Sequence, residues 1–253
     1  MIHQIDKLTV KTFASCSEMS FHAAKDVSVQ IKALLSRKQQ INMIFASAPS
    51  QSEFLKQLVT YKEIEWGKIN AFHLDEYINL DENAPQRFGN FLKTAIFGLL
   101  PFGNVFYLNG NNPIEQECEY YARLLQHYPP DIVCLGIGEN GHLAFNDPHV
   151  ARFDDSEVIK VVDLDETSRR QQVHDKCFEK LEDVPTQALT LTIPTLLSAP
   201  YLFCIVPFKT KAQAVYSTLK GEISENCPAS VLRKAPGQAV LYLDNDSSSL
   251  LNE

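Results

Sequence analysis

The sequence lacks any run that approaches the roughly 18 to 20 consecutive apolar residues that a membrane-spanning helix needs. Its first residues, MIHQIDKLTVKTF, also lack the charged segment followed by an apolar one that marks a secretory signal. We therefore predict a cytoplasmic protein that has no membrane partner.

Basic residues are too few, and cysteines too scattered, for several common classes of protein. Lysine plus arginine is 23 against 31 for aspartate plus glutamate, which gives a net charge of -8, and no basic cluster is present. This balance argues against a nucleic-acid partner. The six cysteines show no C-x-x-C spacing, so the sequence predicts neither structural zinc nor a disulfide framework.

Apolar material is plentiful. The 253 residues are 45% hydrophobic and 21% charged, which suits a globular core and excludes a disordered or collagen-like chain. No linker, repeat or low-complexity segment interrupts the chain. We therefore predict a single domain over residues 1–253, with a frayed tail at 245–253.

Short apolar runs alternate with segments of helical period. Ser15 and Glu18 form a capping box before apolar residues spaced by three and four, which predicts a helix. Ser50 and Glu53 repeat that capping pattern after a strand at 41–46. Further strands are predicted at 68–74, 105–108, 131–138, 157–164, 188–193, 201–206 and 239–244, and further helices at 85–97, 113–127 and 209–220. This pattern predicts the α/β class, with a single-domain, Rossmann-like, mostly parallel sheet covered by helices on both faces.

Two adjacent acids follow one of these buried strands. In such sheets ligands bind at the carboxyl ends of the strands, which is where HLDEY places Asp75 and Glu76. We expect one of them to point into the crevice, partly desolvated, and to act as a base. The alternative is that both are solvated loop acids or helix caps.

The segment LGIGENGHLAFNDP, at 135–148, concentrates polar side chains behind a tight turn. Asn140, His142 and Asp147 lie within eight residues, and a carboxylate five residues after a histidine suggests an imidazole oriented by an acid. The glycines at 136, 138 and 141 also match G-x-G-x-x-G. The match lies in mid-chain and Asn-Asp-Pro replaces the expected helix, so we reject a dinucleotide site.

The turn SAPSQ, from Ser47 to Gln51, precedes a predicted helix. Hydroxyls and backbone N–H groups at a helix N-terminus can bind an anion, so a phosphate could dock there, although Ser50 could equally serve only as a cap. Arg169 and Lys211 could add positive charge to such a site, or could simply be solvated.

These motifs resemble those of the glucosamine-6-phosphate deaminase family, which shares a fold group with the 6-phosphogluconolactonases. The resemblance runs nearly end to end. It rests on LDEY at 74–77, GIGENGHLAFNDP at 136–148, the KAQAV segment from Lys211 and CPAS at 227–230. Lactonases of this group typically read G-H-T-A-S-L-F-P where this chain has GHLAFNDP, which favours the deaminase form.

The resemblance assigns roles to four catalytic residues. Asp75 would be the base that moves a proton between the second and first sugar carbons, and His142 would open the pyranose ring. Asp147 would orient that histidine, standing where the family usually has a glutamate. Asn140 would complete the ring-opening cluster as a hydrogen-bond partner.

The resemblance also implies a phosphate site. Arg169 and Lys211 correspond to the phosphate-binding cations of the family, with Ser47 and Ser50 near the phosphate. Gln51, Glu76 and Gly138 complete the predicted substrate-binding set. The chain departs from the family in having SAPSQ instead of a glycine-rich T-G-G-T-P turn, and in having Arg87 where a serine is common.

The implied activity is a hydrolytic deamination with aldose–ketose isomerisation: glucosamine 6-phosphate and water give fructose 6-phosphate and ammonia. No metal or organic cofactor is implied, the partner is a small sugar phosphate, and a homo-oligomer is compatible with the sequence. One alternative is an isomerase or lactonase that acts on another sugar phosphate. The other is a non-catalytic sugar-phosphate sensor, against which Asp75, His142 and the absence of a basic DNA-binding segment argue.

Overall fold

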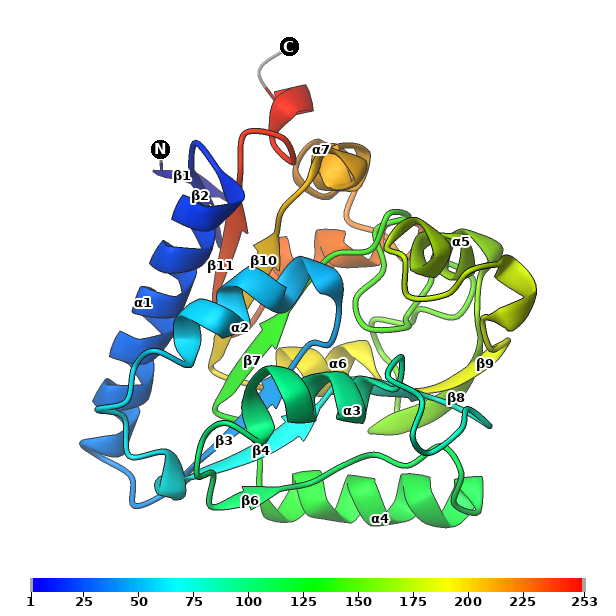
Figure 1. Cartoon of the computed structure of the whole chain (residues 1–253). Helices are drawn as coiled ribbons and strands as arrows, with labels where there is room; N and C mark the ends of the chain where they lie inside the picture. The colour runs from blue at the N-terminus through cyan, green and yellow to red at the C-terminus, as the bar shows by residue number, and fades with distance from the viewer. Residues whose placement is uncertain (1, 252–253) are drawn as a thin grey trace.

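An eight-stranded sheet forms the centre of the computed structural model, which describes residues 2–251 (Figure 1). All neighbouring strands pair in parallel except the first two, which form an antiparallel hairpin at one edge. In spatial order the strands are β1 (Ile2–Ile5), β2 (Leu8–Thr12), β11 (Gln238–Leu243), β10 (Tyr201–Val206), β7 (Ile132–Leu135), β3 (Ile41–Phe45), β4 (Ile69–His73) and β6 (Asn104–Val105).

Helices cover both faces of this sheet. One face packs against α1 (Cys16–Leu35), α2 (Ser52–Leu58) and α3 (Phe88–Leu92), and the other against α4 (Ile114–His127), α6 (Ile193–Leu197) and α7 (Ala212–Lys220). Successive strand residues face opposite sides, so Met43 enters one core and Ile44 the other. The predicted fold class is confirmed. Within residues 2–251 no helix combines the length and the apolarity that crossing a bilayer requires.

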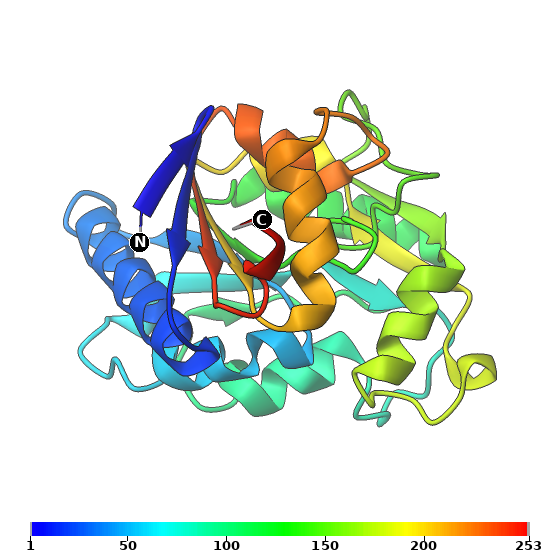
Figure 2. The same cartoon turned by 90° about the horizontal axis from the view of Figure 1, so that it is seen from above.

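A second, three-stranded sheet lies beside the first and is antiparallel. It contains β5 (Asp75–Tyr77), β9 (Gln187–Leu191) and β8 (Ile159–Asp163), and α5 (Glu166–His174) lies in the chain between β8 and β9. The prediction that 157–164 and 188–193 extend the parallel sheet is wrong. Exposed Val161 shows that β8 has one solvent-facing side, as antiparallel sheets commonly do. Figure 2 shows α5 across the molecule from α1.

The strand order reverses between β3 and β7. From β3 the chain builds outward through β4 and β6, then returns to the other side of β3 with β7 and builds outward again through β10 and β11. Phe45, at the end of β3, pairs with Cys134 of β7 and with His73 of β4. The three sequence motifs therefore leave neighbouring strands at the switch point, where ligands bind in sheets of this kind.

The Ser15 cap is confirmed, since the Ser15 hydroxyl accepts a hydrogen bond from the Glu18 N–H at 3.2 Å. The Glu18 carboxylate accepts from the Ala14 N–H at 3.0 Å, one residue before the cap, so the reciprocal bond of a capping box goes to the preceding residue. Ser50 is not a cap, because a 3-10 turn at Pro49–Gln51 precedes α2, which begins at Ser52 without a side-chain cap. Other boundaries also moved: the helix predicted from 85 begins at 88, and the strand predicted at 105–108 covers only 104–105.

The predicted fraying of the tail is wrong for residues 245–251. Ser247 and Ser248 are buried, and a 3-10 turn follows at Ser249–Leu251. The Ser247 N–H donates to the Asp244 carboxylate at 2.8 Å, and the Ser248 hydroxyl donates to the Asp244 carbonyl at 2.7 Å. These bonds turn the chain back onto the end of β11. Residues 252–253 lie outside the described part of the chain.

Candidate active site

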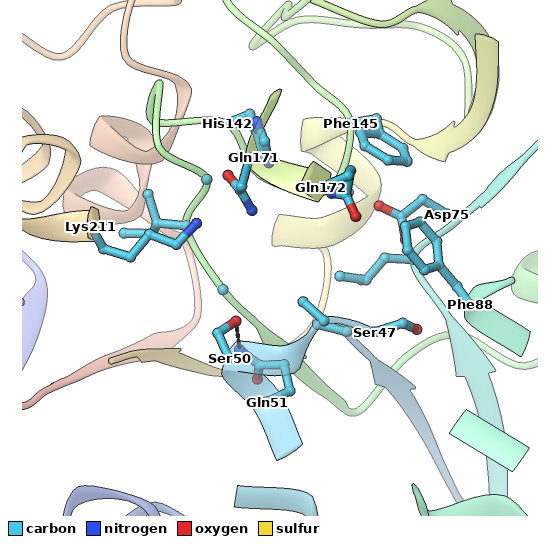
Figure 3. Close-up of a pocket in the computed structure, with 17 residues that line it drawn as sticks. Ser47, Ser50, Gln51, Asp75, Phe88, His142, Phe145, Gln171, Gln172 and Lys211 are labelled. Carbon is cyan, nitrogen blue, oxygen red and sulfur yellow. Dashed lines mark hydrogen bonds between the residues drawn. The ribbon is translucent and has the colours of Figure 1, made fainter. Parts of the chain in front are cut away.

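One pocket gathers the three motifs at the carboxyl ends of β3, β4 and β7 (Figure 3). Side chains from α5 and from the turn before α7 complete its wall. The polar groups that line it are Ser47, Ser50, Gln51, Asp75, His142, Gln171, Gln172 and Lys211. Seven of the predicted site residues line this pocket, namely Ser47, Ser50, Gln51, Asp75, Gly138, His142 and Lys211, whereas Gln171 and Gln172 were not predicted.

Asp75 lies at one side of the pocket, with the rings of Phe88 and Phe145 nearby (Figure 3). Only 6% of the residue is exposed, and no group within residues 2–251 donates a hydrogen bond to its carboxylate. Burial, together with the adjacent charge of Glu76, raises the pKa of Asp75 well above the usual value for an aspartate. A carboxylate in this setting is a strengthened base.

Glu76 points away from the pocket, contrary to its predicted role in binding substrate. Its carboxylate accepts hydrogen bonds from the N–H groups of Tyr77, Phe88 and Gly89, at 2.9, 3.1 and 3.0 Å. The Nε of Arg87 lies 3.7 Å from the same carboxylate, and Arg87 also donates to the Asn109 side chain. Because side chains alternate along a strand, Asp75 and Glu76 must diverge, and Glu76 anchors the start of α3.

His73 hydrogen-bonds to the backbone of Asp75. Its Nδ1 lies 2.9 Å from the Asp75 carbonyl oxygen, and its Nε2 accepts a hydrogen bond from the Leu108 N–H at 2.9 Å. Burial lowers the pKa of His73 to about 4. The ring is therefore neutral at neutral pH, and it holds the end of β4 in place.

His142 belongs to a buried hydrogen-bonded cluster. Its Nδ1 lies 2.9 Å from the Asp147 carboxylate, which also accepts from the Asn140 amide at 3.0 Å and from the Asp165 N–H at 3.1 Å. Burial acts to raise the pKa of Asp147, but the charge of His142 and hydrogen bonds from His142, Asn140 and Ser168 outweigh it and lower that pKa well below the usual range. The predicted pairing of His142, Asp147 and Asn140 agrees with this geometry, and the shorter aspartate reaches the ring.

Gly138 and Gly141 give the loop after β7 its shape. A Cβ on Gly138 would fall 2.1 Å from the His142 Nε2, so only glycine lets the imidazole lie over the backbone there. Gly141 has a φ of 87°, and a Cβ on it would approach the Cys227 Sγ to 2.9 Å. The predicted glycine turn thus brings the backbone against the histidine and against the CPAS segment.

Lys211 faces the pocket from the side opposite Asp75 (Figure 3). Only 2% of the residue is exposed, and its ammonium makes no hydrogen bond or ion pair within residues 2–251. Burial lowers its pKa, against the opposing charges of Asp175 and Glu139. The buried Ser47 hydroxyl also lacks a partner there, whereas Ser50 accepts a bond from the Gln51 amide at 3.3 Å. The end of the pocket that Lys211 and Ser50 form can bind an anion.

Arg169 does not line the pocket, which contradicts its predicted role in holding the phosphate. Its guanidinium donates to the carbonyl oxygens of Leu181 and Val184, at 2.7 and 2.9 Å, and so ties α5 to the following loop. Gln171 and Gln172 line the pocket instead. Together with Ser168 they are spaced by three and four residues and share one buried face of α5, a periodicity that could have identified them.

The fold and the site define an α/β protein whose pocket pairs a buried base and an acid-oriented histidine with a cationic end. Residues 14–241 match the family model described as glucosamine-6-phosphate isomerases/6-phosphogluconolactonase, and the chain belongs to that family. Within residues 2–251, His, Cys, Asp and Glu side chains form no group of three that could hold a metal ion.

Similar proteins carry deaminase names. A glucosamine-6-phosphate deaminase of Bacillus cytotoxicus is 38% identical over 199 residues, covering 76% of this chain and 74% of the relative. Another, of Streptococcus sanguinis, is 36% identical over 207 residues, covering 81% and 85%. A solved monomeric glucosamine-6-phosphate deaminase superposes with a TM-score of 0.86 at 30% identity, covering 95% and 99%. A 6-phosphogluconolactonase of Thermotoga maritima, with a TM-score of 0.76 at 20% identity, shares the fold.

We predict that Glu76→Gln destabilises the protein. The amide would place an N–H₂ group against a backbone N–H that now donates to a carboxylate, so the free energy of unfolding should fall by about 1–3 kcal/mol. Chemical denaturation measures the change, with Glu82→Gln, which alters an exposed acid, as the matched control. Equal stability of the two variants would contradict an anchoring role for Glu76.

Proposed function

We propose that this protein converts glucosamine 6-phosphate and water to fructose 6-phosphate and ammonia. The observation that carries the proposal is one pocket in which the Asp75 carboxylate and the Lys211 ammonium, both without a hydrogen-bond partner among residues 2–251, face each other, with His142 between the two sides. The family and the deaminase relatives support the same reaction.

The substrate would lie across the pocket with its phosphate at the Lys211 end. There the ammonium and the Ser50 hydroxyl would contact the phosphate oxygens. The Gln51 amide, which donates to the Ser50 hydroxyl and to the Ile205 carbonyl, would hold that serine in place, whereas the Ser47 hydroxyl lies on the Asp75 side of the pocket (Figure 3). The first and second sugar carbons would then lie toward Asp75. Gly138, which also lines the pocket, would allow the sugar to approach the backbone beside His142.

Ring opening would be the task of His142. The Nε2 of the imidazole would take the proton from the hydroxyl on the first carbon and return it to the ring oxygen as the carbon–oxygen bond breaks. Asp147, supported by Asn140, would hold the ring and balance its transient positive charge.

Isomerisation and deamination would follow on the open chain. The Asp75 carboxylate would remove the proton from the second carbon while the aldehyde oxygen of the first carbon takes up a proton from solvent, giving an enolamine. As Asp75 returns its proton to the first carbon, the nitrogen lone pair would form a carbon–nitrogen double bond at the second carbon. Water would add to that carbon and ammonia would leave, which gives the ketose. None of these steps requires a metal or an organic cofactor.

We further propose that the chain works as a single domain in the cytoplasm, which suits an enzyme that acts on a small sugar phosphate. Assembly into a homo-oligomer stays a prediction, and light scattering of the purified protein would measure it.

We predict that purified protein releases ammonia from glucosamine 6-phosphate, and that Asp75→Asn lowers kcat by about 100-fold or more because the general base is lost. Galactosamine 6-phosphate and 6-phosphogluconolactone are assayed beside it, and Asp154→Asn, which makes the same change at an exposed acid, is the control. Consumption of the lactone without ammonia release from either amino sugar would overturn the proposal.

The pH dependence should report the environment of Asp75. The base must be ionised to act, and burial raises its pKa, so kcat/KM should fall as the pH is lowered, with a midpoint above the value of about 4 at which an ordinary aspartate titrates. Stopped assays over a pH series measure this midpoint. Full activity persisting down to pH of about 4 would contradict the buried-base assignment.

Lys211→Met should weaken phosphate binding. Loss of a buried charge partner costs about 2–5 kcal/mol, so KM should rise roughly 30-fold or more. Lys209→Met removes an exposed lysine from the same 3-10 turn and should leave KM unchanged. Similar KM values for the two variants would place the phosphate elsewhere.

A further inference from the structure

A buried serine contacts the side of His142 that faces away from the pocket. Ser168 lies on α5, is 1% exposed, and does not line the pocket. Its Oγ is 2.7 Å from the His142 Nδ1 and also makes a short hydrogen bond to the Asp147 carboxylate. One hydroxyl therefore bridges both members of the ring-opening pair.

The direction of these hydrogen bonds follows from the donors available. The oxygen Oδ1 of Asp147 accepts from Asn140 and Ser168, and its Oδ2 accepts from the backbone of Asp165, so the group is bonded as an ionised acceptor. A serine hydroxyl carries a single proton, which is directed to Asp147. Its oxygen can then only accept from the His142 Nδ1, and Nδ1 must carry a proton.

This arrangement differs from that of a nucleophilic serine. In a Ser-His-Asp triad the serine and the aspartate bond to opposite nitrogens of the imidazole, so that the histidine can draw the proton from the serine. Here Ser168 and Asp147 both lie at Nδ1. Nε2 is left on the other side of the ring, next to the pocket-lining Gly138.

We propose that Ser168 is a positioning residue that holds His142 in the tautomer protonated at Nδ1, so that Nε2 offers its lone pair to the substrate. The proposal deepens the function proposed above and rests on it for the role of His142 in ring opening. Asp147 alone gives the ring one anchor, shared with the Asn140 amide, and the Ser168 hydroxyl adds a second anchor to the same nitrogen.

The helix that carries Ser168 also forms the pocket wall. Ser168, Gln171 and Gln172 occupy one buried face of α5, and both glutamines line the pocket. The Gln171 side-chain oxygen accepts a hydrogen bond from the Glu139 N–H at 2.9 Å, in the loop that leads to His142. The position of α5 therefore fixes both the shape of the pocket and the tautomer of its histidine.

NMR of isotope-labelled histidine nitrogens tests the tautomer directly. Of the seven histidines, His142 is assigned by the signal lost in His142→Gln. In the wild-type protein Nδ1 should be protonated and Nε2 not. Ser168→Ala should yield a mixture of tautomers, whereas Ser168→Thr, which keeps a hydroxyl, should restore the wild-type pattern. Thr167→Ala, which removes an exposed hydroxyl from the same turn, is the control.

The turnover number kcat should change in parallel with the tautomer pattern of these variants. Ser168→Ala should lower kcat by about 10- to 100-fold, which corresponds to the loss of one hydrogen bond to a charged group. KM should change little. Ser168→Thr should recover most of the lost kcat. Ser168→Cys replaces the hydroxyl by a thiol, which is a weaker hydrogen-bond donor. It should also lower kcat, and it serves as the test if Ser168→Ala does not fold.

A wild-type tautomer pattern in Ser168→Ala overturns the proposal, even where kcat falls, because the serine would then act only on stability. A tautomer that responds to Ser168 in a protein that releases no ammonia supports the tautomer assignment and refutes the proposed function. The two hypotheses therefore fail separately.

Discussion

Two buried charged groups, Asp75 and Lys211, line one pocket from opposite sides, and the strand ends and turns around it hold them there. A buried charge is costly unless something compensates it. Within residues 2–251 neither the Asp75 carboxylate nor the Lys211 ammonium makes a hydrogen bond or an ion pair. A ligand with a phosphate at one end and an acidic carbon–hydrogen bond at the other complements both groups, which is the chemistry of an amino sugar phosphate.

Asp75 is held in place by His73 and Glu76, which do not line the pocket. Glu76 ties three backbone N–H groups to the end of β5, and His73 bonds to the carbonyl of Asp75. The parallel order of β4, β3 and β7 then sets the base beside the histidine loop. The pocket is thus built from strand ends whose relative positions the main sheet fixes, which suits a reaction that requires separate proton transfers at defined atoms.

The sequence predicted those features that depend on local pattern. The Ser15 cap, the apolar strands and the polar clusters at 75 and 140–147 are visible in the order of residues alone. What it missed depends on how distant segments pack. The small antiparallel sheet forms because β9 pairs with both β5 and β8, and Arg169 turns to the loop carbonyls because it lies off the buried face of α5. A helix predicted at α5 would have identified Ser168, Gln171 and Gln172 as residues of one face.

The orientation of the substrate is the central claim, and a crystal structure with an open-chain analogue tests it most directly. The reduced sugar 2-amino-2-deoxyglucitol 6-phosphate has the phosphate and the amino group but cannot isomerise. The account predicts its phosphate on Lys211 and Ser50, and its second carbon against the Asp75 carboxylate. A phosphate bound away from Lys211, or a second carbon out of reach of Asp75, would contradict it.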